Sequence, residues 1–190
     1  AADARWVFGR LYYVLGQVGG SWTERNGRVS SSPMWEAEFD RTGRRWGFNY
    51  RLVGFGESFE AQSGYVRRND MVEFHASNRF TYYGQRGTWL ENLTTFFGPT
   101  RIWRYASFGR AGAIEGGENI HATAQLRGGW QLGAQGSRAF VQFEPVMYQA
   151  YSLQQPNGAI TAFAPPDSAT NWSGTYSVTT PVFRRVDSKV

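Results

Sequence analysis

The sequence predicts an all-β protein, an antiparallel up-and-down transmembrane β-barrel, or part of one, with roughly 8–10 strands. Residues 120–135 alternate between apolar and polar side chains without a break, which is the period of a strand with one apolar face. Aromatic residues make up 17 % of the chain, and Gly occurs 23 times. Long alternating strands, rings with a polar edge and many glycines are together typical of bacterial outer-membrane barrels.

The length of the alternating segments favours a membrane-crossing strand over a soluble one. A strand over 120–135 would be about 50 Å long, whereas strands of soluble domains have about 5–6 residues. Further strands are predicted over 6–18, 35–39, 46–52, 72–83 and 139–143, with two more within 88–108 around Gly98-Pro99. The segment Arg41-Thr42-Gly43 predicts a hairpin. In 139–143 the pattern places Ala139 on the apolar face and Arg138 on the polar face.

Alternation alone does not say which face points inward. A soluble barrel turns its apolar side in, whereas a membrane barrel turns that side to lipid and lines its lumen with the polar side. Strand length, glycine content and aromatic enrichment favour the membrane arrangement. We expect these side chains to face the membrane: Trp35, Trp46, Phe74, Leu126 and Trp130. We expect these to face the lumen, which is either open or plugged: Glu36, Glu38, Arg51, Glu73, Arg79 and Arg127.

Charge and composition exclude several classes of partner. The net charge is +5, but the Arg residues are spread along the chain and form no basic run, which argues against nucleic acid. The chain has no Cys and so forms no disulfide. It contains no run of about 18 apolar residues that would predict a membrane-spanning helix. Residues 1–6 lack the pattern of a signal peptide, so we expect a mature form or a fragment of an exported protein.

The stretch from Trp35 to Tyr83 carries a motif of moderate specificity. It reads Trp46-Gly47-Phe48, then Gly56, Phe59, 64–68 (Gly-Tyr-Val-Arg-Arg) and Asp70. This motif resembles a family of bacterial outer-membrane barrels without known activity, whose longer members carry an N-terminal domain similar to a family 9 carbohydrate-binding module.

The chain departs from that family in four ways. Tyr replaces the usual Phe at position 65, the chain is much shorter, and it lacks both the sugar-binding-like domain and the C-terminal aromatic residue. The resemblance implies a barrel in the bacterial outer membrane but no activity. It also implies that the full reading frame would hold a signal peptide, an N-terminal β-sandwich and a terminal aromatic residue.

Arg67, Arg68 and Asp70 are the first candidate ligand-binding residues. Arg side chains bind carboxylate or phosphate with two parallel hydrogen bonds, so these residues could bind a sugar acid or the phosphates of lipopolysaccharide. The alternative is an Arg–Asp pair that fixes a loop at the barrel rim. Trp172, expected in a late loop, is the candidate for stacking on a sugar ring.

The two histidines, His75 and His121, do not predict a metal or catalytic site. Two His without a well-placed carboxylate are too few ligands for a metal. Ser77 lies two residues from His75 on the same strand, about 7 Å away and too far for a direct hydrogen bond. We therefore expect no enzyme, no metal and no cofactor.

We expect a single domain: barrel strands over 1–151, a long polar loop over 152–174, and a short strand and tail over 175–190. The expected function is a structural, transport or envelope-complex role in the outer membrane. The expected partners are outer-membrane lipid or lipopolysaccharide and other envelope proteins. The alternative is a soluble all-β module that binds a sugar or another small ligand.

Overall fold

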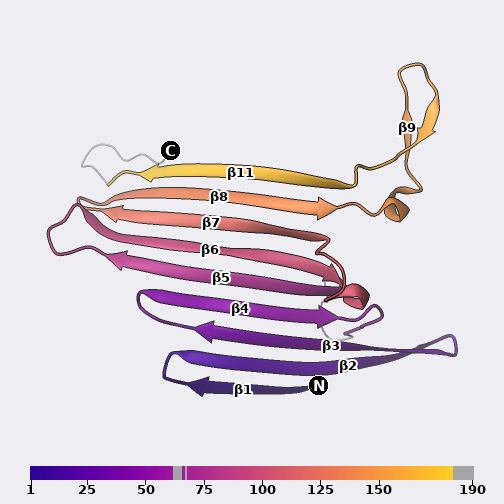
Figure 1. The fold of residues 1–190 in the computed structure, drawn as a ribbon, viewed down its shortest axis with the longest axis horizontal. Helices are drawn as coiled ribbons and strands as arrows, with labels where there is room; N and C mark the ends of the chain where they lie inside the picture. Colours follow the sequence, from indigo (N-terminus) through magenta and orange to yellow (C-terminus); the bar gives the residue numbers. More distant parts are fainter. Residues whose placement is uncertain (62–65, 67, 182–190) are drawn as a thin grey trace.

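The computed structural model describes residues 1–61, 66 and 68–181 (Figure 1). Long strands dominate this part of the chain. The strands are β1 (Ala2–Phe8), β2 (Tyr12–Arg25), β3 (Arg28–Arg41), β4 (Trp46–Phe55), β5 (Met71–Tyr83), β6 (Leu90–Arg104), β7 (Glu115–Leu126), β8 (Trp130–Gln142), β9 (Ser152–Gln154), β10 (Ile160–Ala162) and β11 (Ser168–Thr179). Two short 3₁₀ helices are η1 (Tyr105–Ser107) and η2 (Pro145–Tyr148).

Nine of these strands form one antiparallel sheet in the order β1-β2-β3-β4-β5-β6-β7-β8-β11. Apart from the β9–β10 hairpin, which stands outside the sheet, each strand pairs with the next along the chain (Figure 1). This confirms the prediction of an all-β, up-and-down antiparallel fold. Within the described residues β1 and β11 pair on one side only, so the sheet has two edges and does not close.

Two segments predicted as single strands are hairpins, and those predictions were wrong. The alternating run 120–135 turns at Arg127-Gly128-Gly129, where both glycines have φ +86°. The segment 6–18 turns at 9–11. In both hairpins a three-residue turn joins partners four positions apart, as in Leu126↔Trp130. Cross-strand partners point to the same face, so the alternation continues through the turn and hides it.

Residues 88–108 show the opposite error, because one strand, β6, runs through Gly98-Pro99. The pairing of β6 with β7 is continuous here, through Gly98↔Asn119 and Pro99↔Glu118. The ladder between β5 and β6 is interrupted between His75↔Thr100 and Asn78↔Phe97. Proline cannot donate to a ladder, and the partner strand on the other side keeps the segment extended.

The loop expected over 152–174 ends earlier in the structure. The region holds the β9–β10 hairpin, and β11 begins at Ser168, so residues 168–174 are strand. Every residue of β11 pairs with β8, from Ser168↔Gln142 to Thr179↔Gln131. Tertiary pairing here overrides a composition of Ser, Asn and Gly that by itself favours a loop. The expected tail beyond 181 lies outside the described residues.

The sheet is a single layer with almost no core. Among the residues whose burial the structure describes, five hydrophobic side chains are buried: Phe48, Val53, Met71, Val72 and Ala76. The accessible area is 13835 Å², whereas a compact protein of 21.5 kDa exposes about 9,200 Å². Within the described part of the chain, neither face of the sheet is therefore covered by a second layer of the kind that soluble domains use to bury their apolar side chains.

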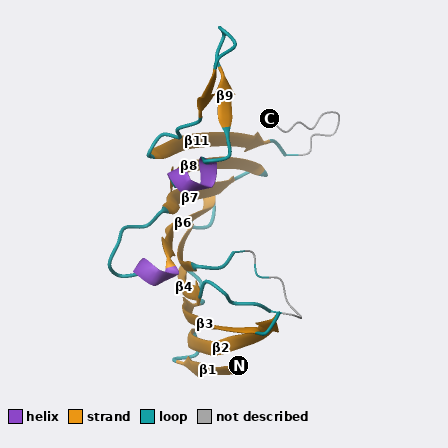
Figure 2. Cartoon of the chain, turned by 90° about the vertical axis from the view of Figure 1, so that its right-hand side faces the viewer, coloured by secondary structure: helices purple, strands orange, loops and turns teal. Residues whose placement is uncertain are grey.

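Figure 2 shows the sheet bent into an arc. Alternate residues of β2 indicate the direction of the bend. Val14, Val18 and Trp22, on the apolar face, are 40 %, 60 % and 75 % exposed. Their neighbours Leu15 and Gln17, on the other face, are half-buried. Side chains on the concave side of a bent sheet crowd together, so the apolar face is the convex one.

Connections differ in length between the two ends of the strands. At one end they are short: 9–11, 42–45, 84–89 and 127–129. At the other end three of the four are long: 26–27, 56–70, 105–114 and 143–167. The strands are also staggered. An unbroken line of paired residues starts at Phe8, the last residue of β1, and reaches Gly174, well inside β11. Stagger of this kind is what a sheet needs to close into a tilted barrel.

Candidate functional site

The convex face carries an aromatic belt near the short turns. The Trp46 and Phe80 rings stack with 6.2 Å between their centroids, and Phe39 meets Phe48 edge-on at 4.9 Å. Trp46 and Phe80 remain 39 % and 46 % exposed. Trp46 and Phe80 are packed against neighbouring rings but are not covered, which is how aromatic girdles lie at a membrane interface.

A second belt lies toward the long loops. Trp35 Nε1 donates a hydrogen bond to the Tyr105 hydroxyl at 3.2 Å, and Phe108 lies 6.3 Å from the Trp35 ring and 5.4 Å from the Trp103 ring. Trp35 pairs with Gly54, about eight residues from Trp46 along β4. That separation is about 26 Å along a strand, or about 20 Å along the axis of a barrel with ordinary tilt. The apolar band of an outer-membrane barrel is about 25 Å tall.

The concave face carries polar side chains bonded to one another across strands. Arg51 Nε donates to Glu36 at 2.6 Å, and the Tyr13 hydroxyl donates to Glu38 at 2.6 Å. The amide of Asn49 also donates to Glu38. The structure thus brings Glu36, Glu38 and Arg51 together on the face where the sequence predicts a lumen.

The other predicted lumen residues divide between strand and turn. Glu73 and Arg79 share the concave face, and Arg79 donates to the carbonyl of Gly43 in the β3–β4 turn. Arg127 lies in the β7–β8 turn, where its backbone N–H donates to the Trp89 carbonyl at 2.7 Å. Its placement on a lumen-lining strand was therefore wrong, because the turn between β7 and β8 begins at this residue.

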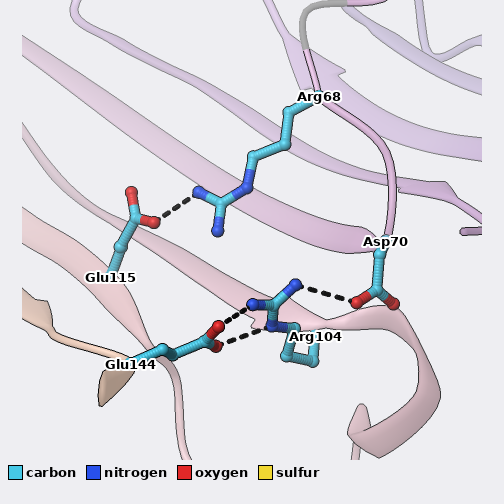
Figure 3. Close-up of polar contacts among 5 residues, drawn as sticks. All are labelled: Arg68, Asp70, Arg104, Glu115 and Glu144. Atoms are coloured by element: carbon cyan, nitrogen blue, oxygen red, sulfur yellow. Dashed lines mark hydrogen bonds and ion pairs between the residues drawn. The ribbon is translucent and has the colours of Figure 1, made fainter. Parts of the chain in front are cut away.

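A network of charges joins the long-loop ends of several strands on the concave side (Figure 3). Arg104, the last residue of β6, donates to Asp70 at 2.9 Å and, through Nε, to Glu144 at 2.8 Å. A second contact through Nη2 makes the pair with Glu144 bidentate. Arg68 pairs with Glu115 at the start of β7. We call these five residues the rim network.

The rim network is an electrostatically coupled group of charges beside an open hollow. Glu144 raises the pKa of Arg104 above its ordinary value, partial burial opposes that rise, and Asp70 adds to it. An open hollow of about 450 Å³ adjoins the network and is lined in part by Tyr148 and Phe143. The carboxylates outnumber the two arginines, so the network carries a net negative charge when all five groups are ionised.

These contacts bear on the predicted anion site. Arg68 and Asp70 do not pair with each other: Arg68 forms an ion pair with Glu115 and Asp70 forms one with Arg104, and both contacts tie the segment before β5 to neighbouring strands. Binding of an anion by Arg68 and Asp70 therefore stays a prediction. Arg67 lies outside the described residues. Trp172 is not in a loop: it lies in β11 on the convex face, 72 % exposed, with the Arg138 guanidinium 5.7 Å from its ring.

Sequence reasoning missed three charged residues on the convex face: Arg101, Glu118 and Arg138. Glu118 pairs with Arg138 across strands and accepts hydrogen bonds from both arginines, the one from Arg138 at 3.3 Å. The assignment of Arg138 to the polar face was wrong, because the register places it with Trp130 and places Ala139 on the concave face. The even-numbered apolar positions of 120–135, continued past 135, would have revealed this.

Neither histidine contacts an acid in the described residues. His75 Nδ1 lies 3.1 Å from the Thr100 hydroxyl, and His121 Nε2 lies 3.2 Å from the Thr123 hydroxyl. In the part of the chain that the structure describes, no group of three or more His, Cys, Asp or Glu could hold a metal ion. None of the helices in that part has the length and apolar character needed to cross a membrane.

We compared the chain with protein-family models, with curated proteins and with solved structures, and none of the three comparisons found a match. The resemblance of residues 35–83 to an outer-membrane barrel family therefore stays a prediction.

Proposed function

We propose that the chain forms the curved wall of a bacterial outer-membrane β-barrel, with its convex apolar face against lipid and its concave polar face lining the interior. The observation that carries the proposal is the uncovered apolar face, which runs across all nine strands of the sheet. An exposed apolar surface of this extent marks a contact with a membrane or with another protein. The two aromatic belts, at the spacing of a bilayer's apolar band, favour the membrane.

The difference in length between the turns at one end of the strands and the loops at the other indicates how the wall is oriented in the membrane. Outer-membrane barrels have short turns on the periplasmic side and long loops on the outside. The turns at 9–11, 42–45, 84–89 and 127–129 are then periplasmic, and the rim network lies at the external mouth. Charges of both signs on the concave face suit the passage or binding of polar solutes, so we propose a transport or structural role in the envelope.

Closure of the wall requires further strands. Because every neighbouring pair is antiparallel and the sheet has nine strands, β1 and β11 run in the same direction (Figure 1). Direct pairing of these edges would make a parallel junction, and so would a ring of identical nine-stranded walls. An antiparallel barrel, which is the rule in bacteria, therefore needs an odd number of added strands. These would come from the same protein or from an envelope partner.

Extraction behaviour tests this function. The chain, expressed with an export signal in a Gram-negative host, should sediment with outer membranes, withstand washing with alkaline carbonate, and dissolve only in detergent. The reason is that no second layer among residues 1–61 and 68–181 covers the apolar convex face, so lipid or detergent must cover it. The maltose-binding protein of the periplasm, which is soluble, serves as the control: it should appear in the soluble fraction of the same cells. Recovery of the chain as a compact monomer in buffer without detergent would overturn the proposal and favour a soluble binding module.

A further inference from the structure

One cluster of charged residues lies on the convex face away from the strand ends. Apart from Glu24, Arg41 and Glu91 at strand ends, the charges that the nine described strands place on this face are Arg101, Glu118 and Arg138. A charge at the middle of a lipid-facing surface costs about 2–4 kcal/mol, and the cost falls nearly to zero at the interface. The presence of three charges on this face must therefore be explained by their depth in the bilayer or by a bound ligand.

Their depth corresponds to the lipid headgroups. Arg138 is about eight residues from Trp130 along β8, about 26 Å along the strand and about 20 Å along a tilted barrel axis. Trp130 lies beside the short turn. The cluster thus lies at the edge of the hydrocarbon on the long-loop side, level with the headgroups of the outer leaflet.

The cluster holds more positive than negative charge. Arg101 is fixed: it donates to Glu118, and also to the carbonyls of Thr100 at 2.8 Å and Gly117 at 3.0 Å. Arg138 makes one hydrogen bond among the described residues, at 3.3 Å to Glu118, and its side chain is 39 % exposed. A guanidinium has five N–H donors in a flat fork, so most of those on Arg138 remain available to an anion.

Aromatic rings surround the two guanidinium groups. Arg138 lies 5.7 Å from the Trp172 ring and 5.9 Å from the Phe140 ring, and Arg101 lies 5.5 Å from Phe140. Gly116 leaves the space for this, since a Cβ there would come within 3.0 Å of both Arg101 Cδ and the Phe140 ring. The rings hold the guanidinium groups by cation–π contact and offer an apolar surface to the sugar or acyl chain of a lipid.

We propose that Arg101 and Arg138 bind a phosphate of an outer-leaflet lipid headgroup of the phosphorylated-disaccharide (lipid A) class, with Trp172 and Phe140 against its apolar part. The proposal rests on the proposed function, because it needs the convex face to lie in the membrane. Arginine forks match phosphate oxygens bidentately, and Glu118 sets the spacing of the two arginines while leaving the site with a net positive charge.

Binding of defined lipids tests the site. Detergent-solubilised protein would be titrated with diphosphorylated lipid A, with the same lipid after removal of its phosphates, and with inorganic phosphate, and bound lipid would be counted by native mass spectrometry. We expect the phosphorylated lipid to bind at least about tenfold more tightly than the dephosphorylated one. Arg138→Gln should lose most of this preference. Arg51→Gln, which removes one paired arginine from the concave face, should keep it.

The outcomes separate this inference from the proposed function. Equal binding of the two lipids by protein that does require detergent, or an equal loss in Arg51→Gln, would overturn the phosphate site alone. Displacement of the lipid by millimolar inorganic phosphate would show that the site binds free phosphate and would overturn the assignment to a lipid headgroup. Protein that stays in solution without detergent would overturn the barrel itself. Arg138→Gln leaves the Arg101–Glu118 pair intact, and Trp172→Ala, which alters no charge, provides a second variant that should weaken lipid binding.

Discussion

An arginine at position 134 is expected to cost about 2–4 kcal/mol of folding free energy in a bilayer, whereas an arginine at position 135 is expected to cost almost nothing. Ala134 lies on the convex face between Ala122 and Tyr176, four positions along β8 from both Trp130 and Arg138. Gln135 points to the concave face beside His121. The two positions are adjacent in one strand, so strand propensity and backbone pairing are nearly matched, and the proposed function assigns the main difference to lipid on one face and the barrel interior on the other.

Reversible folding into phospholipid vesicles, followed by denaturant titration, measures this difference. Ala134→Arg should shift the folding midpoint strongly, and Gln135→Arg should stay within about 0.5 kcal/mol of the parent. Ala134→Gln separates the effect of charge from that of size. Equal costs at the two positions, or a larger cost at 135, would contradict an apolar face turned to lipid.

Substitution of Gly98 by Ala is expected to destabilise the sheet by about 2–3 kcal/mol. A Cβ at this buried position would lie 1.8 Å from the Ala76 carbonyl oxygen of the neighbouring strand. That contact is with backbone and cannot be relieved by a rotamer change, so β5 and β6 would have to separate. They approach closely here because their ladder is already interrupted between His75↔Thr100 and Asn78↔Phe97.

Gly16→Ala is the matched control for Gly98→Ala. Gly16 is also a strand glycine, but a Cβ there would have nothing within 4 Å. Denaturant unfolding of the two variants in the same detergent should show a loss only for position 98, and the control should remain within about 0.5 kcal/mol of the parent. A Gly98→Ala protein as stable as the control would show that β5 and β6 do not approach each other in this way.

The sequence predicted faces better than it predicted turns. Glu36, Glu38 and Arg51 gather on one face and Trp35 and Trp46 lie on the other, because a period of two depends only on local geometry. The turn at 127–129 escaped detection because a three-residue turn preserves the alternation. The face of Arg138 was misassigned because Phe140 looked like a break in the pattern, whereas it continues the apolar face of β8.

The sites depend on strand order, which periodicity does not contain. Arg104 meets Glu144, forty positions away in sequence, because β6, β7 and β8 are neighbours in the sheet. Arg101 and Arg138 share Glu118 for the same reason. The direction of curvature, which decides which face is convex, likewise depends on the packing of the whole sheet.

The alternation of environment along β8 tests the central claim most directly. The chain has no Cys, so single cysteines from Gln131 to Ser137 can each carry a nitroxide in the membrane-reconstituted protein. We expect labels at the even-numbered positions to collide often with oxygen dissolved in lipid and rarely with a water-soluble nickel complex, and labels at the odd-numbered positions to show the reverse. Even-numbered positions that meet the nickel complex as often as their odd-numbered neighbours would contradict a lipid-facing convex wall.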